Sequence, residues 1–153
     1  MADVFSQMYI HLVFSPAKRD ALICPEWEER LYKYITGIVQ KRGHKLLAIG
    51  GMADHIHILI GFKPVESVSD LVREIKTAST DFIRAEKLSP FKFNWQNGYG
   101  VFTCSRSDVH RICQYILKQK EHHRKVGFKE EFTELCHDFG IEKGKKIYFD
   151  FFG

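Results

Sequence analysis

The chain has 153 residues and a formal net charge of +4 at pH 7, and its residues are 44% hydrophobic and 14% aromatic. This length fits one compact domain and leaves too little chain for a second core, so we expect a single domain spanning residues 1–153. The apolar content excludes disorder over most of the length. The mild positive charge is compatible with nucleic-acid binding without demonstrating it.

The cysteines and the distribution of apolar residues predict a cytoplasmic protein that does not enter a membrane. No two cysteines form a CxxC pair, and we expect four free thiols in a reducing compartment: Cys24, Cys104, Cys113 and Cys136. The first residues lack the basic and apolar regions of a signal peptide. No apolar run approaches the ~20 residues that span a bilayer.

Hydrophobic periodicity and turn residues divide the chain into strands and helices. Strands are expected at apolar runs rich in β-branched or aromatic residues: 7–14, 45–49 and 55–60, with a short strand at 100–104 and a last one at 147–152. Helices are expected where apolar residues recur at helical spacing: from Pro25 to Gly43, from Ser67 to before Pro90, at 107–123 and at 128–139.

The order of these elements up to residue 104 is strand, helix, strand, strand, helix, strand. This order predicts an α+β fold of the ferredoxin-like, split βαβ type, in which both helices cover one face of an antiparallel sheet. The first and third strands are then neighbours in the middle of the sheet. We expect the other face to be open for a site or a partner, and a C-terminal helix to follow the sheet. Such a fold settles no function by itself.

Two histidines alternate with isoleucines in the third strand. Because side chains alternate between faces, Ile56, Ile58 and Ile60 point to the helices. His55 and His57 then project side by side from the other face, where two neutral imidazoles could bind one divalent ion. The alternative is a pair of ordinary histidines on a half-exposed strand.

Two further polar residues lie near this pair. Asp54 could accept a hydrogen bond from an imidazole and so orient a metal ligand, or it could be a turn residue. His11 falls opposite the apolar residues of the first strand, on the same face as the pair. It could contact the site or DNA, or have a structural role.

The predicted helix at 107–123 carries a polar stripe beside its apolar one. Tyr115, Gln119 and His122 are spaced i, i+4 and i+7, which can bring a phenol and an amide oxygen into one site. A phenol with a pKa near 10 is a poor nucleophile unless a cation or base helps to remove its proton. A metal held by the histidine pair would supply that help. The alternative is a tyrosine at the edge of a helix-packing surface.

The segment GMADHIHILI at residues 51–60, followed by YILKQ at 115–119, closely resembles the single-tyrosine HUH transposases of small bacterial insertion sequences and their relatives associated with palindromic repeats. HUH stands for His, hydrophobic residue, His. The likeness extends over most of the chain, through YIHLVFSPAKR, SVSDLVREIK, FNWQNGYGVFTCS and QYILKQKEHH in that order. The order and spacing of these segments are more specific than any one of them.

This resemblance implies a DNA transposase that cleaves and rejoins single-stranded DNA through a 5′-phosphotyrosine intermediate. The strand would be presented beside a hairpin. The resemblance also implies that His55, His57 and Gln119 bind Mg²⁺ or Mn²⁺ and that Tyr115 is the nucleophile. His122, like Asp54 and His11, could orient a metal ligand or contact DNA. The family often has Asn where this chain has Lys118, a position outside the predicted ligand set. A homodimer with active sites shared between subunits is also implied.

Three other functions remain open at this point. A non-catalytic module that binds single-stranded nucleic acid is disfavoured, because the face that would stack bases carries histidines and few aromatic residues. A zinc hydrolase would need another histidine or carboxylate ligand. A replication-type HUH nickase would use the same chemistry but is usually longer.

Overall fold

A computed structural model of the protein describes residues 4–17, 22–122 and 127–141, with the side chain of His122 left out. The strand expected at 147–152 lies outside these residues. None of the helices in the described ranges is long and apolar enough to cross a membrane.

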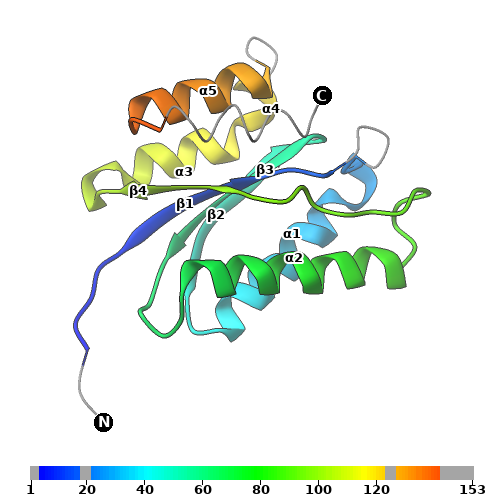
Figure 1. The fold of residues 1–153 in the computed structure, drawn as a ribbon, viewed down its shortest axis with the longest axis horizontal. Coiled ribbons are helices and arrows are strands. Elements are labelled where there is room, and N and C mark those ends of the chain that lie inside the picture. Colours follow the sequence, from blue (N-terminus) through cyan, green and yellow to red (C-terminus); the bar gives the residue numbers. More distant parts are fainter. Residues whose placement is uncertain (1–3, 18–21, 123–126, 142–153) are drawn as a thin grey trace.

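The four strands form one antiparallel sheet in the order β2-β3-β1-β4 (Figure 1). They are β1 (Tyr9–Phe14), β2 (Lys45–Met52), β3 (His55–Gly61) and β4 (Gly100–Cys104). β1 and β3 are therefore the central neighbours, as predicted, with Val13 opposite His57. The α+β fold expected from the sequence is confirmed.

Two long helices cover one face of the sheet (Figure 1). α1 (Pro25–Lys41) begins at a proline, which suits the first helical turn because that turn needs no amide donor. α2 (Val68–Ala85) is capped by Ser67, whose Oγ accepts a hydrogen bond from the amide of Asp70 at 3.0 Å. Both helices start where their sequence signals predict.

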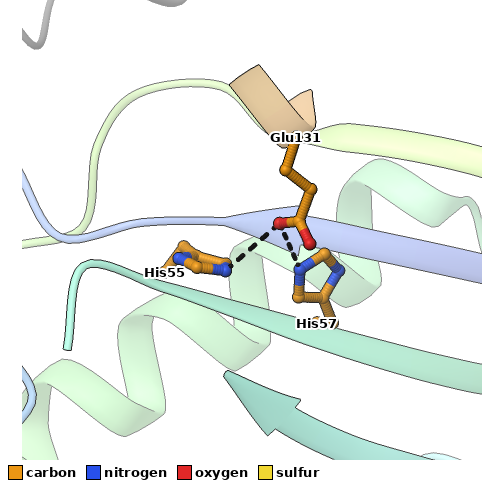
Figure 2. Close-up of side chains that lie close together, drawn as sticks. All are labelled: His55, His57 and Glu131. Carbon is orange, nitrogen blue, oxygen red and sulfur yellow. Dashed lines mark hydrogen bonds and ion pairs between the residues drawn. The ribbon is translucent and has the colours of Figure 1, made fainter. Parts of the chain in front are cut away.

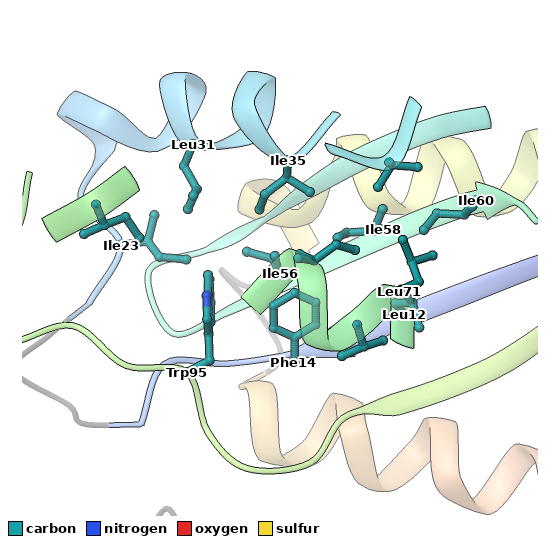
Figure 3. Packing of buried hydrophobic residues seen from close by; sticks show 14 of the residues in the cluster. Leu12, Phe14, Ile23, Leu31, Ile35, Ile56, Ile58, Ile60, Leu71 and Trp95 are labelled. Atoms are coloured by element: carbon teal, nitrogen blue, oxygen red, sulfur yellow. The ribbon is translucent and has the colours of Figure 1, made fainter. Parts of the chain in front are cut away.

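The main core lies between these helices and the sheet (Figure 3). Ile56, Ile58 and Ile60 of β3 are completely buried against it, as their alternation predicts. Full burial of each such side chain contributes roughly 1.5–3 kcal/mol. This packing makes β3 a rigid support for the residues that point the other way.

The opposite face of the sheet is not open, which corrects the prediction. After the short 3₁₀ helix η1 (Arg106–Asp108), this face is covered by α3 (Val109–Leu117), α4 (Gln119–His122) and α5 (Phe128–Asp138). The strands carry apolar side chains on this side too, including Val13 and Leu59, and burying them favours the extra layer. The predicted helix at 107–123 is also interrupted, because Lys118 leaves helical geometry at φ −101° and ψ 22°.

Candidate metal and nucleophile site

His55 and His57 project from β3 toward the second helical layer, and neither side chain is exposed to solvent. Their rings lie 5.0 Å apart. The Nε2 atoms of both rings face one carboxylate oxygen, Oε1 of Glu131, at 3.3 Å from His55 and 3.0 Å from His57 (Figure 2). The two imidazoles thus converge on one point between β3 and α5.

The opposite nitrogen of each imidazole is held by a neighbouring side chain. His55 Nδ1 lies 2.7 Å from Asp54 Oδ1, and His57 Nδ1 lies 2.8 Å from His11 Nε2. When Nδ1 donates the proton in both contacts, Nε2 is the nitrogen of each ring that can lose its proton and offer a lone pair to a cation beside Glu131. Asp54 and His11 therefore lie where they can orient the histidine pair.

Two more side chains reach the same point: Tyr115 from α3, which we call the tyrosine helix, and Gln119 from the start of α4. Gln119 is 1% exposed, and its Oε1 lies 3.1 Å from His55 Nε2. Its amide nitrogen donates to Glu131 Oε2 at 3.2 Å. The Tyr115 hydroxyl donates to the same oxygen, and the Tyr115 ring lies 5.6 Å from the His57 ring. All these side chains belong to one chain.

Glu131 is the residue that sequence reasoning missed. It is 2% exposed although it carries a carboxylate, and its two oxygens contact both histidines, Gln119 and Tyr115. It lies on the apolar face of α5, between Phe128 and Phe132. An acidic residue on the apolar stripe of a predicted helix was the available signal, because a buried carboxylate requires partners.

The donor atoms of this cluster fit a divalent cation. The ligand atoms of His55, His57 and Glu131 all lie within 4.8 Å of one another. Gln119 Oε1 adds a neutral oxygen beside them. Mixed imidazole nitrogens and oxygens suit Mn²⁺ and zinc, and the oxygen donors also suit Mg²⁺.

The charges around the cluster shift the pKa values of its members. Burial lowers the pKa of His55, but hydrogen bonds to Asp54 and Glu131 outweigh it and raise that pKa to about 9. Burial and the neighbouring His57 lower the pKa of His11 to about 3. Burial and Glu131 raise the pKa of the Tyr115 phenol above its ordinary value. Without a cation, the Glu131 carboxylate therefore favours the protonated forms of His55 and Tyr115. A bound cation would supply the positive charge that these protons otherwise provide.

Helix α5 closes the site from solvent. Phe128 at its start stacks on His55, with ring centroids 4.2 Å apart and planes 7° apart. A cavity of about 170 Å³ remains beside His11, Tyr115 and Glu131. Pockets that hold small ligands usually have roughly 300–1,000 Å³. The cavity is therefore too small for a nucleotide while α5 occupies this position.

The predicted site residues whose side chains the structure describes all come together. Six side chains form a connected cluster: His11, Asp54, His55, His57, Tyr115 and Gln119. The side chain of His122 lies outside what the structure describes. The chemical roles of these residues stay predictions.

Several known proteins are similar to this chain. The ISDra2 transposase TnpA of Deinococcus radiodurans is 24% identical over 120 residues, covering 75% of this chain and 86% of the relative. The transposase for insertion sequence element IS200 of Salmonella typhimurium is 27% identical over 117 residues, covering 72% of this chain and 76% of the relative.

Solved structures share the fold. A crystal structure of a protein from Deinococcus radiodurans R1, assigned as a transposase, superimposes with a TM-score of 0.61 at 26% identity, covering 78% of this chain and 95% of the other. A REP-associated tyrosine transposase bound to a REP hairpin superimposes with a TM-score of 0.59 at 17% identity, covering 82% of this chain and 76% of the other. At this identity the second likeness concerns the fold alone.

The family described as "Transposase IS200 like" matches residues 4–119. This range contains the histidine pair, Tyr115 and Gln119, and ends before the helix that carries Glu131. The match spans most of the chain and agrees with the fold and with the buried histidine cluster. The chain belongs to the IS200-like transposase family.

Proposed function

We propose that this chain is a metal-assisted transposase that cleaves and rejoins single-stranded DNA through a 5′-phosphotyrosine at Tyr115. One observation carries the proposal: the Tyr115 hydroxyl and the Nε2 atoms of His55 and His57 meet at the two oxygens of one buried carboxylate, Glu131. A phenol beside a cluster of metal ligands suits phosphoryl transfer, because both the nucleophile and the phosphate need positive charge nearby.

His55, His57 and Gln119 would hold Mg²⁺ or Mn²⁺, and Glu131 would add an anionic ligand. When bound, the ion would polarise a non-bridging phosphate oxygen and stabilise the charge that develops during transfer. Asp54 and His11 keep the ligating nitrogens aimed at the ion through the opposite nitrogens of the two rings.

Tyr115 carries the covalent step. Its Oη loses a proton and attacks phosphorus, so that a bond from Oη to phosphorus forms while the bond from phosphorus to O3′ breaks, and the released O3′ takes up a proton. Glu131 Oε2 already accepts the hydrogen bond of this hydroxyl and can accept the proton. In the second step a 3′-hydroxyl loses its proton and attacks phosphorus, the bond from phosphorus to Tyr115 Oη breaks, and the phenolate takes up a proton as the phosphodiester is restored. Each step exchanges one ester for another, so ATP is not required.

DNA reaches this site only if α5 moves. His55 and His57 are fully buried, and Phe128 and Glu131 of α5 cover them. α5 packs on a small cluster of its own, which includes Val13 and Phe102, so it can move without disturbing the main core. We therefore include an open state of α5 in the proposal.

The substrate in this proposal is single-stranded DNA beside a hairpin, as the family resemblance implies. The structural relative bound to a REP hairpin shares the fold. A homodimer is also part of the proposal, although one chain suffices to bring the predicted site residues together.

A sheet that binds bases by stacking, as in the non-catalytic alternative, would leave its central strands accessible. Here α3 and α5 lie over those strands, and the central positions hold His11, His55 and His57. This arrangement favours an enclosed catalytic site over a binding platform.

The proposal is tested by incubating the protein with hairpin-flanked single-stranded DNA and Mn²⁺ and resolving products on a denaturing gel. The wild type should form a covalent protein–DNA band, and Tyr115→Phe should abolish it. Tyr34→Phe, which changes an exposed tyrosine on α1, is the matched control and should keep the band. A band that persists in Tyr115→Phe would show that another group attacks, and the absence of any adduct would favour the binding module.

A further inference from the structure

Gly50 of β2 lies directly beside the histidine pair. It is paired across the sheet with His57, so a side chain at position 50 would point to the same face as the His57 imidazole. The last turn of α3 occupies that space instead. A Cβ atom at Gly50 would lie 2.4 Å from the backbone oxygen of Ile116 and 3.2 Å from its carbonyl carbon.

The carbonyl of Ile116 approaches the backbone of Gly50 more closely than the Cβ atom of any other residue type would allow. Even favourable contacts between a carbon atom and a carbonyl oxygen have separations of about 3.3–3.6 Å. The obstructing atom is backbone, so no side-chain rotation can relieve the contact. A methyl group at position 50 must push the end of α3 away from the sheet. Ile116 follows Tyr115 directly and precedes Gln119 by three residues, so both predicted site residues would move with it.

A second contact holds the chain immediately after Gln119. Lys120 Nζ donates to Glu28 Oε1 of α1 at 2.5 Å and lies 3.5 Å from the carbonyl oxygen of Gly51. The Glu28 side chain is only 13% exposed, whereas that of Lys120 is 58% exposed. Lys120 therefore joins the start of α4 to both α1 and the end of β2, across a cleft of about 460 Å³.

We propose that Gly50 and Lys120 are positioning residues that set the tyrosine helix against the histidine pair of its own chain. Gly50 allows the backbone of Ile116 to lie close to β2. Lys120 holds the start of α4, directly after Gln119, through its ion pair with Glu28. Together they bracket the amide that lies 3.1 Å from His55. This inference rests on the proposed function for its catalytic consequence, but its structural consequence can be measured separately.

The first test compares Gly50→Ala with Gly37→Ala, a helical glycine whose added Cβ would meet nothing within 4 Å. Adduct formation in Gly50→Ala should slow by about 100-fold, the effect expected when a nucleophile is misplaced by about an ångström. Binding of the DNA should be unchanged. Mn²⁺ binding, measured by calorimetry, should weaken by about tenfold as Gln119 withdraws. Gly37→Ala should match the wild type in all three measurements.

Amide hydrogen exchange supplies the readout that does not depend on activity. In Gly50→Ala, exchange should accelerate at residues 115–120 and stay unchanged in α1 and α2. A Gly50→Ala protein with wild-type exchange, Mn²⁺ affinity and adduct rate would overturn the inference.

The second test changes Lys120 and applies even if Gly50→Ala does not fold. Lys120→Met should slow adduct formation by about fivefold, and the double variant Lys120→Glu, Glu28→Lys should recover most of the loss by restoring the pair. Lys33→Met is the matched control, because Lys33 pairs with Glu29 on the exposed side of α1. Equal rates for Lys120→Met and Lys33→Met, with equal exchange at residues 115–120, would overturn the role of Lys120.

A wild type that forms no adduct with any single strand would instead contradict the proposed function. The exchange and Mn²⁺ measurements would still decide whether Gly50 and Lys120 position Gln119, so the two failures are distinguishable.

Discussion

Each histidine of the pair uses its two ring nitrogens for different purposes. Nδ1 of His55 is bound by Asp54 and Nδ1 of His57 by His11, while both Nε2 atoms face Glu131. This division matters because an imidazole binds a metal only through an unprotonated nitrogen. The local partners therefore set which nitrogen is available.

The raised pKa of His55 predicts that metal binding depends on pH. With a pKa of about 9 in the metal-free protein, His55 is protonated at neutral pH and must release its proton when a cation binds. The apparent Mn²⁺ affinity should rise with pH by up to about tenfold per unit from pH 6 to 9 and then level off. Calorimetry in two buffers of different ionisation enthalpy would measure the released proton.

Asp54→Ala provides the matched variant for this measurement. Because Asp54 raises the pKa of His55, removing it should move the plateau to lower pH. The same variant should weaken Mn²⁺ binding at pH 9 by roughly 10–100-fold, since the ring loses its orienting partner. A wild-type affinity that is constant between pH 6 and 8 would contradict the protonation of His55.

The elements show how far a sequence can predict a site. The alternation of isoleucine and histidine in β3 predicted the buried face and the projection of His55 and His57, because a strand repeats every two residues. The break at Lys118 was not predictable from periodicity. It lies between two tertiary contacts, Ile116 on Gly50 and Lys120 on Glu28, which sequence periodicity does not reveal.

α5 was predicted as a helix, but its position was not. The pattern of Phe128, Phe132 and Cys136 indicates a buried face without saying which surface it covers. The strands beneath carry apolar side chains on the second face of the sheet, and these must be buried. Which side chains share that face is known only once the order of the strands is known. Glu131 enters the site as a consequence of this docking.

Glu131→Gln tests what α5 contributes. The amide keeps the size of the side chain but loses the negative charge and the proton-accepting oxygen, so adduct formation should fall by about 100-fold or more. Glu130→Gln changes an exposed residue on the same helix and should retain wild-type rates. Rates should be measured in single-turnover reactions at saturating Mn²⁺. A faster reaction in Glu131→Gln would show that the carboxylate only blocks the site.

In the molecule as a whole, α1 and α2 lie on one face of the sheet and α3, α4 and α5 on the other (Figure 1). The core packs under α1 and α2, and the site lies between the sheet and the second helical layer. Changes in the site can therefore alter chemistry without unfolding the domain. Within one chain, the tyrosine helix already lies over its own histidines.

This arrangement predicts the result of mixing two inactive variants. Tyr115→Phe lacks the nucleophile and His57→Ala lacks a metal ligand, so a site built within one chain cannot be completed by combining them. The mixture should form no adduct above the level of either variant alone, even after joint refolding. Recovery of up to about one quarter of wild-type activity, as random pairing in a dimer would give, would show that subunits exchange tyrosine helices.

The most direct measurement is to locate the covalent bond itself. The adduct formed with single-stranded DNA should be digested with nuclease and trypsin, and the modified peptide sequenced by mass spectrometry. The proposed mechanism predicts a nucleotide joined through its 5′-phosphate to Tyr115, within the peptide of residues 112–118. Attachment at any other residue, or cleavage without an attached nucleotide, would contradict it.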